Sequence, residues 1–383
     1  MNLLSNKSNI LFINACLFFS LTFFLGAIGN EFSISYINLI SAFILFLIYS
    51  LSNRRVVATK QFQIWTYISL LLIFFSFLFV GGGVGSLIYN VSFVLLICVF
   101  YNISLSKYDI KLYVTYIRIL NFYLLLYVLF TGKYDGFFGG INSNSIGIQA
   151  AINFALFSIF PYRNKIIQLL LLGSSVFIAL LASSRTSLGS ILLFVITGWI
   201  SKYIFQMYRS KNVCYWVLIL LAIYVTYLYS YTLSEYAFIY SAMEYSTENF
   251  NKSIFTGREY IWQTAWDKLL MSTQNLLFGI GSNFYAKGEL SNGSNFHSSF
   301  FTIVICCGFC GYFCLMKLFH FLFKGNPKNV NNSGRFSLLS LPLMFIGIFE
   351  SVLFGGNFAI QLCMFITICH TKYDSESLFF INK

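Results

Sequence analysis

The sequence predicts an all-α, polytopic integral membrane protein with about twelve transmembrane helices and one large external loop. Three observations support this fold class: the composition, the recurrence of long apolar runs, and the placement of Lys and Arg between them. Apolar residues make up 58% of the chain and charged residues only 9%, whereas soluble domains carry roughly 25% charged residues. A water-soluble fold is therefore excluded.

The predicted spans follow from the length of the apolar runs, because crossing the hydrocarbon core takes about 20 residues of helix. The first run follows Lys7 but is long for a signal peptide and lacks a clear small-residue cleavage site, so we expect an uncleaved first helix. No internal repeat interrupts the series, and residues 1–383 are predicted to form a single membrane domain. The runs lie near residues 10–28, 34–52, 63–80, 86–105, 110–131, 145–161, 166–183, 186–204, 213–233, 298–322, 336–350 and 353–370.

Orientation follows from Lys and Arg, which accumulate in cytoplasmic loops. Alternate connections place seventeen of these residues on one side of the predicted membrane. The other side carries six, namely Lys133, Arg185, Lys252, Arg258, Lys268 and Lys287. Both termini are therefore predicted to be cytoplasmic and residues 234–297 to form the external loop. The net charge of +12 is distributed among these topology-setting patches, which argues against nucleic acid as a partner.

Metal and nucleotide chemistry are not predicted. All nine cysteines lie in or beside apolar runs, so no disulfide framework is implied. Cys307 and Cys310 form a C-x-x-C, but a structural zinc site needs four ligands, and small residues that pack a membrane helix are the better interpretation. The chain has no D-x-D pair, no P-loop and no H-E-x-x-H motif. We therefore expect neither a metal nor a cofactor.

The large loop is the first place to look for function, since connections held by a rigid scaffold often carry it. Within it, Thr256-Gly-Arg-Glu259 matches a capping box. Apolar residues then recur at helical spacing, which predicts an amphipathic helix over 257–272. We expect this helix to lie at the membrane interface with Trp262 and Trp266 at headgroup depth.

Two external arginines are candidates for binding an anion. Arg258 falls in the first turn of the predicted loop helix, where free N–H groups and the helix dipole favour negative charge and a guanidinium adds donors suited to phosphate. Alternatively, Arg258 pairs with Glu259 or a lipid headgroup. Arg185 lies at a short external junction between two helices, where an arginine needs an anionic partner. Alternatively, it caps the preceding helix.

Three further titratable residues stand in or beside predicted spans. His297 closes the large loop, and a neutral imidazole is suited to accept a proton, although a lone interfacial histidine is more often structural. Arg118 lies well inside the fifth span, which makes it a functional candidate by default, while snorkelling to the cytoplasmic face is the alternative. The roles of Arg118 and Glu350 stay open at this point.

The order of these features resembles the superfamily of O-antigen ligases and Wzy-type polymerases. The resemblance covers about residues 135–315 and rests on several short motifs in sequence order on one side of the membrane. These are Phe138-Gly139-Gly140 with Asn142 and Asn144, Ser184-Arg185-Thr186, Gly257-Arg258 followed by Trp262, Leu277-Phe278-Gly279-Ile280-Gly281, and His297 before a helix that bears Gly308 and Gly311.

The resemblance implies glycan transfer from a polyprenyl diphosphate carrier, without metal or nucleotide. Arg185 and Arg258 would hold the diphosphate, His297 would act as general base, and Asn144 and Trp262 would contact the substrate. The implied reaction polymerises undecaprenyl-diphosphate-linked oligosaccharide units into O-antigen or capsular-type polysaccharide at the external, periplasmic face of the bacterial cytoplasmic membrane.

Three alternatives remain at this point. An O-antigen ligase would transfer the glycan to lipid A core, and a flippase would transport the lipid-linked oligosaccharide instead of elongating it. A scaffolding membrane protein would leave the two arginines and the histidine unexplained. Besides the lipid-linked substrate and membrane lipids, a chain-length regulator and a flippase of the same pathway are the implied partners.

Overall fold

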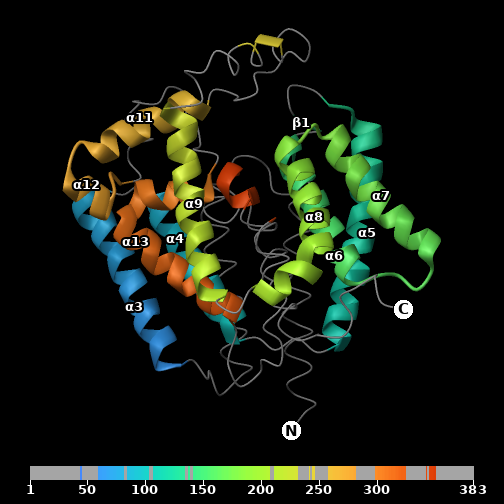
Figure 1. Cartoon of the computed structure of the whole chain (residues 1–383), viewed down its shortest axis with the longest axis horizontal. Coiled ribbons are helices and arrows are strands. Elements are labelled where there is room, and N and C mark those ends of the chain that lie inside the picture. The colour runs from blue at the N-terminus through green and yellow to red at the C-terminus, as the bar shows by residue number, and fades with distance from the viewer. Residues whose placement is uncertain are drawn as a thin grey trace.

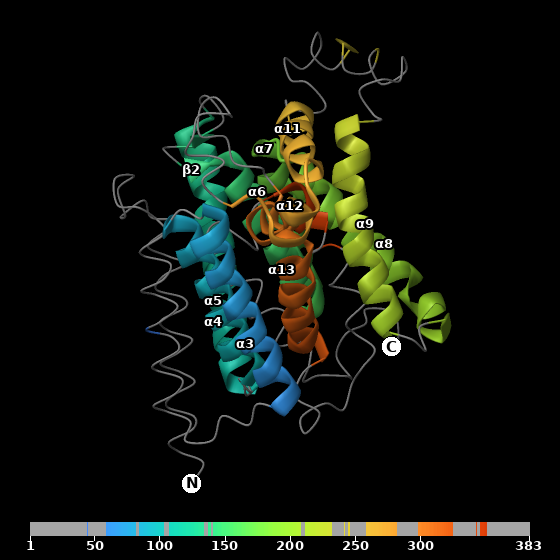
Figure 2. The ribbon, with the colours of Figure 1, turned by 90° about the vertical axis from the view of Figure 1, so that its left-hand side faces the viewer.

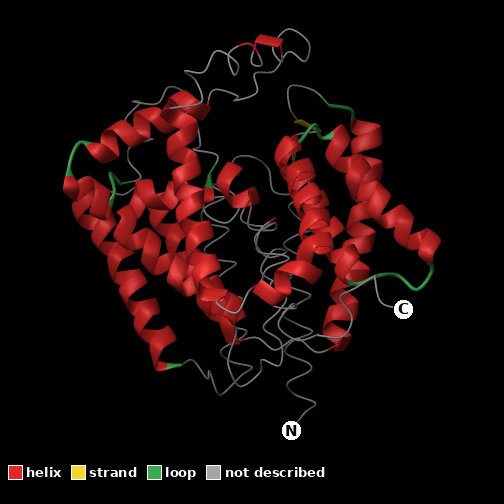
Figure 3. Cartoon of the chain, viewed as in Figure 1, coloured by secondary structure: helices red, strands yellow, loops and turns green. Residues whose placement is uncertain are grey.

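The computed structural model describes a mostly helical protein with one short β-hairpin (Figure 3). The described residues are 59–81, 84–102, 107–133, 137–138, 141–207, 211–231, 258–281, 298–324 and 345–350, with Ile44, Ser241, Glu244, Tyr245 and Pro342. The predicted spans near 10–28 and 353–370, nearly all of the one near 34–52 and much of the large loop lie outside them. The elements are α3 (Lys60–Phe75), the π-helix η1 (Ser76–Gly81), α4 (Val84–Asn102), α5 (Lys107–Thr131), β1 (Phe137–Phe138), β2 (Ile141–Asn142), α6 (Ser143–Ile159), α7 (Lys165–Leu181), α8 (Arg185–Met207), α9 (Lys211–Tyr231), α11 (Arg258–Leu270), α12 (Thr273–Phe278) and α13 (Ser299–Lys324).

Three of the described helical segments are long and apolar enough to cross a membrane: Lys60–Val80, Lys111–Thr131 and Ser299–Phe321. Further apolar helices occupy the positions of other predicted spans, among them Lys165–Leu181 and Ile219–Tyr231. The structure thus supports a helical membrane protein. The total of about twelve spans and the side on which the large loop lies stay predictions.

The described helices form two groups, which stand apart in Figure 1, while Figure 2 views the chain from the side of α3. In the first group, here called the α5–α8 bundle, α6 packs against α5, α7 and α8. In the second, here called the α13 bundle, α13 contacts α3, α4, α9 and α12, while α11 packs on α9. The short helical stretch 345–350 lies between the two groups (Figure 1). It therefore acts as a bridge between them.

Helix α8 contacts this bridge and also Pro342, which lies shortly before it in the chain. The Ser190 hydroxyl donates to the carbonyl of Pro342 at 3.3 Å. One residue earlier on α8, a Cβ built on Gly189 would lie 2.8 Å from the ring of Phe345. Gly189 thus leaves room for the Phe345 ring, and a side chain at this position would require that ring to shift.

Buried polar side chains tie the α5–α8 bundle together. Asn121 of α5 donates from Nδ2 to Ser174 at 2.8 Å and accepts at Oδ1 from Asn153 at 3.0 Å and from Ser175 at 3.1 Å. Gln149 adds a bond from Nε2 to Asn153 Oδ1 at 2.8 Å. Each of these bonds except the last joins two helices, and such bonds stabilise helix association where lipid removes the hydrophobic driving force.

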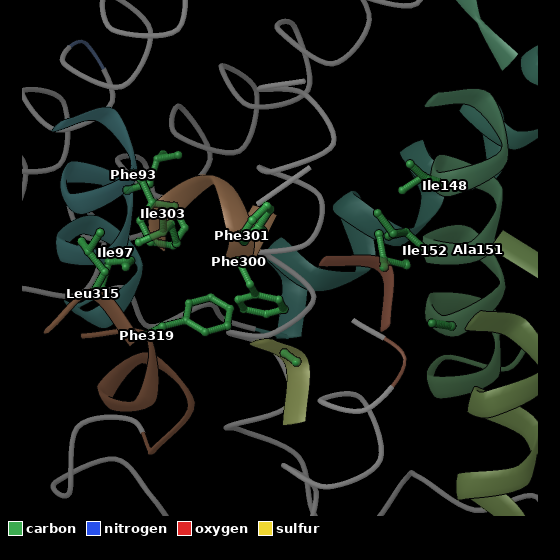
Figure 4. Close-up of a cluster of buried hydrophobic side chains, with 14 of the residues drawn as sticks. Phe93, Ile97, Ile148, Ala151, Ile152, Phe300, Phe301, Ile303, Leu315 and Phe319 are labelled. Carbon is green, nitrogen blue, oxygen red and sulfur yellow. The ribbon is translucent and has the colours of Figure 1, made fainter. Parts of the chain in front are cut away.

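The α13 bundle is packed chiefly with apolar and aromatic side chains. Figure 4 shows residues of α13 facing Phe93 and Ile97 of α4, with a separate group from α6 on the far side. Phe93 and Phe319 approach to 6.1 Å between ring centroids, and both are essentially buried. The core of this bundle therefore consists largely of buried apolar and aromatic side chains.

Helix α13 is broken at Gly308, which has a φ of +65°. A Cβ built on Gly308 would lie 2.3 Å from the carbonyl carbon and oxygen of Leu277. Gly279, with a φ of +86°, approaches in return, and its Cβ would lie 2.6 Å from the carbonyl oxygen of Ile305. Both positions require glycine because of their backbone conformation and because no side chain fits. The Leu277–Gly281 motif is thus the segment that docks into the break.

The break leaves helix carbonyls without their usual partners, and neighbouring elements supply replacements. The Ile280 N–H donates to the carbonyl of Ile305 at 2.9 Å. The Ser76 hydroxyl, at the start of η1, donates to the carbonyl of Cys306. Irregular backbone at membrane depth is tolerated only where protein satisfies its polar groups, and the first residue of η1 and the segment that follows α12 do so here.

Arg118 has a structural role in the α5–α8 bundle. Its Nη2 donates to the carbonyl of Phe160, the C-cap of α6, at 3.3 Å. Its guanidinium carbon lies 4.9 Å from the centroid of the Tyr162 ring. A cation at a helix C-terminus is favourable, so Arg118 holds the end of α6.

Candidate functional site

The starts of three helices meet at the carboxylate and backbone of Glu350, the last described residue of the bridge. Glu350 Oε1 accepts from Arg258 Nη2 at 3.2 Å and from Thr186 Oγ1 at 3.3 Å. The Glu350 carbonyl accepts from Ser299, from its N–H at 3.2 Å and from its hydroxyl at 2.7 Å. Arg258 and Ser299 are the first residues of α11 and α13, and Thr186 is the second residue of α8. One residue thus joins both bundles.

This arrangement suits an anion. Helix N-termini present free N–H groups and the positive end of the helix dipole. The Arg258 guanidinium adds a full positive charge that is largely shielded from water, since its side chain is 14% exposed. Glu350 is 6% exposed, and a buried acid is stable only when it is paired and hydrogen-bonded. The site therefore already holds one negative group.

Both terminal nitrogens of the Arg258 guanidinium bind residues of the bridge. Nη1 donates to the carbonyl of Phe349 at 2.6 Å, and Nη2 forms the ion pair with Glu350. The partner that the structure shows is thus Glu350, 92 residues further along the chain, where the sequence had left Glu259 or a lipid headgroup as alternatives. The predicted helix over 257–272 is confirmed as α11, while Thr256 of the proposed capping box lies outside the described residues.

Arg185 is exposed and begins α8 directly beside Thr186. The turn before it contains Ser183 at a φ of +52°, a left-handed conformation that costs a non-glycine residue energy. Lys133 donates from Nζ to the carbonyl of Ala182, the C-cap of α7, at 3.1 Å. Lys133 thus fills the capping role that the sequence had considered for Arg185.

Asn144 lies in the first turn of α6, behind the β1–β2 hairpin. Its N–H donates to Asn142 Oδ1 at 2.8 Å, so Asn142 is the N-cap of α6. One turn further, a Cβ built on Gly147 would lie 2.4 Å from the Cβ of Ser184. The close approach of α6 and α8 at Gly147 places the first turn of α6 next to the Arg185 junction.

Trp262 and Trp266 pack inside the protein. Trp262 is 0% exposed and contacts the rings of Tyr229 at 4.9 Å and Phe301 at 6.1 Å between centroids. Trp266 is 4% exposed and stacks on Phe301 at 5.2 Å. The apolar face of α11 thus meets α9 and α13, and neither tryptophan faces the lipid headgroups as an interfacial helix would require. The depth of α11 in the membrane stays a prediction. Trp262 holds the helix that carries Arg258.

His297 lies outside the described residues. The two serines that follow it, Ser298 and Ser299, are fully buried at the start of α13. Ser298 accepts at its hydroxyl from the Phe301 N–H at 3.2 Å, and Ser299 binds the Glu350 carbonyl. The described segment that begins at Ser298 thus contributes Ser299 to the site.

Sequence reasoning missed Glu350 and Thr186 as members of this site. The available signal was an acidic residue at the end of a predicted span, a position where an ionisable group has a function by default. Within the described ranges, no group of three or more His, Cys, Asp or Glu side chains is placed to hold a metal ion. The polar groups that the site presents are those of an anion receptor.

Comparison with known proteins gives one match. Residues 169–316 match the family model described as O-antigen ligase. That segment runs from α7 to α13 and contains both Arg185 and Arg258. The match does not support the flippase alternative. No curated protein and no solved structure matches the chain.

Proposed function

The O-antigen ligase domain at residues 169–316 supports membership of the O-antigen ligase and polymerase superfamily, and on this premise we propose that the protein is a glycosyltransferase that polymerises lipid-linked glycan. The donor is an undecaprenyl-diphosphate-linked oligosaccharide repeat unit. The product is a longer O-antigen or capsular-type polysaccharide on the carrier of the acceptor unit.

The observation that carries this proposal is the meeting of α8, α11 and α13 at a cationic site. A diphosphate is a good leaving group when cations meet its developing charge, and such electrostatic stabilisation is usually the largest catalytic contribution. Arg258 offers a guanidinium that is already oriented by the Phe349 carbonyl. Arg185 stands one residue from Thr186 on the opposite bundle. The two arginines hold the diphosphate from two sides.

His297 is the general base in this proposal. It accepts the proton of the acceptor hydroxyl, whose oxygen attacks the anomeric carbon of the donor sugar. The bond from that carbon to the diphosphate oxygen breaks, and undecaprenyl diphosphate leaves. Asn144, beside the Arg185 junction, contacts the glycan. Trp262 serves the reaction through packing, since it fixes α11 and with it Arg258.

The site lies at the external face of the bacterial cytoplasmic membrane, with both termini in the cytoplasm. Membrane lipids are expected partners because three described helical segments are long and apolar enough to cross a membrane. A flippase and a chain-length regulator of the same pathway are its expected partners. The flippase delivers the lipid-linked unit, and the regulator limits the length of the product.

An O-antigen ligase is the second candidate, and the description of the matching family favours it. Both reactions use the same donor and differ in the acceptor: the ligase transfers glycan to lipid A core, and the polymerase to another lipid-linked unit. The 20% aromatic content and the loosely matching loop are more typical of the polymerases.

Reconstitution tests the proposal. The purified protein in proteoliposomes receives undecaprenyl-diphosphate-linked repeat units, with or without lipid A core, and gel electrophoresis measures chain length. We expect long chains without lipid A core. We expect Arg258→Ala, Arg185→Ala and His297→Ala each to lower the rate by about 10²–10³-fold.

Arg163→Ala is the matched control, because it removes an exposed arginine from a predicted cytoplasmic loop and should leave the rate unchanged. Long chains made by all three site variants would disprove the assigned roles. Transfer that occurs only to lipid A core would establish the ligase instead.

A further inference from the structure

The carboxylate of Glu350 occupies the position where the proposed function requires a phosphate oxygen. Two donors reach the same atom, Glu350 Oε1: Arg258 Nη2 at 3.2 Å and Thr186 Oγ1 at 3.3 Å. One donor comes from the α13 bundle and the other from the α5–α8 bundle. A carboxylate oxygen and a phosphate oxygen accept from such donors in the same way. The carboxylate therefore marks an anion subsite and its ligands.

A phosphate cannot simply join Glu350 in this subsite. Glu350 is 6% exposed, and two negative groups that share a buried site repel each other. One of them has to leave or lose its charge. The contacts of Glu350 indicate that its side chain can leave alone, because the backbone is anchored separately through Ser299 at 2.7 Å and 3.2 Å.

We propose, on the basis of the proposed function, that the substrate diphosphate displaces the Glu350 carboxylate from Arg258 and Thr186, and that Thr186 is a phosphate ligand. In the absence of substrate, the Glu350 carboxylate then occupies the place of a substrate phosphate oxygen. It keeps the Arg258 guanidinium oriented in the empty site, so that little ordering is needed when the diphosphate arrives. The bond from Arg258 Nη1 to the Phe349 carbonyl, at 2.6 Å, remains during the exchange.

The opposite assignment is that Glu350 is a permanent positioning residue, which stays paired with Arg258 while substrate binds. The two assignments predict opposite signs for one substitution. Glu350→Gln keeps an oxygen that accepts from Arg258 and Thr186 but removes the negative charge. If the diphosphate has to displace Glu350, the weaker pairing of the neutral glutamine side chain with Arg258 makes diphosphate binding tighter. If Glu350 instead positions Arg258 for the substrate, the same weaker pairing makes diphosphate binding looser.

The experiment measures diphosphate affinity by isothermal titration calorimetry on the full-length protein in nanodiscs. The probes are inorganic pyrophosphate and farnesyl diphosphate. Because a hydrogen bond to a charged group contributes on the order of one factor of ten in affinity, we expect Glu350→Gln to bind both probes about tenfold tighter. We expect Thr186→Val, which removes the hydroxyl and keeps the shape, to bind them about tenfold more weakly.

Ser190→Ala is the matched control. Ser190 lies one turn further along α8 than Thr186 and donates to the carbonyl of Pro342, shortly before the bridge in the chain, and not to the Glu350 carboxylate. We expect its diphosphate affinity to equal that of the unmodified protein. A change in affinity equal to that of Thr186→Val would assign the Thr186 effect to loosening of the bridge and would overturn the ligand role.

The outcomes separate this inference from the proposed function. If Arg258→Ala weakens binding and Glu350→Gln tightens it, both stand. If Arg258→Ala weakens binding while Glu350→Gln weakens it or leaves it unchanged, the displacement is wrong and the diphosphate site remains. If Arg258→Ala leaves binding unchanged, the diphosphate site itself is wrong.

Discussion

The two helix bundles are held together by different forces. In the α5–α8 bundle, Asn121 of α5 accepts hydrogen bonds from Asn153 of α6 and Ser175 of α7. In the α13 bundle, aromatic rings such as those of Trp262 and Phe301 fill the interior, and glycine lets backbones approach. Directional bonds fix which residues face each other, while ring packing supplies contact area. The two arginines proposed to hold the diphosphate are divided between the two bundles, so the proposed site needs both.

The largest expected effect comes from removing the aromatic anchor of the α13 bundle. Trp262→Ala leaves a large buried cavity beside Tyr229 and Phe301, and we expect a loss of about 3–5 kcal/mol in the free energy of unfolding. Unfolding in SDS, followed by tryptophan fluorescence, measures it. Leu270→Ala is the control, since that side chain is 49% exposed on the same helix. Equal losses in both variants would contradict the role of Trp262.

The glycine contact at the α13 break gives the next effect. Gly308→Ala forces a Cβ against the backbone of Leu277 at a positive φ, and we expect a loss of about 2–4 kcal/mol from overpacking and strain. Gly173→Ala in α7 is the matched control, because a Cβ there meets nothing within 4 Å. We expect it to raise stability by about 0.5–1 kcal/mol. A tolerated Gly308→Ala would show that α12 does not dock in the break.

A third test addresses the polar bonds of the α5–α8 bundle. Asn153→Leu removes the acceptor of Gln149 Nε2 and one of the two donors to Asn121 Oδ1, and we expect a loss of about 1–2 kcal/mol in the free energy of unfolding. A double-mutant cycle with Asn121→Leu should show coupling between the two positions, since both sides of the bond are then removed. Ser158→Ala is the control on α6, because its hydroxyl bonds only the Phe154 carbonyl of its own helix. Additive losses would argue against the shared bond.

The smallest expected effect lies between the bundles. Ser190→Ala removes the bond from α8 to the Pro342 carbonyl, and we expect a loss of about 0.5–1 kcal/mol in stability. Protection of the Glu350 amide from hydrogen exchange should fall in parallel, because that segment bridges the two bundles. A loss as large as that of Trp262→Ala would mean that the bridge, and not either bundle, sets overall stability.

Much of the helical framework could be predicted from the sequence, because apolar runs of span length have few other solutions. The run near 110–131 corresponds to α5 (Lys107–Thr131), and the run near 166–183 to α7 (Lys165–Leu181). Arg258 at the start of a loop helix was also predicted, since capping and spacing are local signals. The division into two bundles was not, because it depends on which apolar faces meet.

Two site features could not be predicted for a physical reason. The apolar stripe that contains Trp262 has the same periodicity whether it faces lipid or another helix, because lipid tails are as apolar as a protein interior. The pairing of Arg258 with Glu350 joins residues 92 positions apart, and several acids could have served. Only the fold decides which carboxylate reaches the guanidinium.

The break at Gly308 has a consequence for how the chain assembles in a bilayer. Helix α13 has 26 residues, about 39 Å of helix, which exceeds the hydrocarbon thickness of about 30 Å. Split at Gly308, each piece is shorter than the about 20 residues that a span needs, and the exposed carbonyls of Ile305 and Cys306 would meet lipid. The Ser76 hydroxyl and the Ile280 N–H cover them. We therefore expect α13 to reach its final depth only after the earlier segments from α3 to α12 have gathered around it, so that biogenesis of this helix is a late, partner-dependent step.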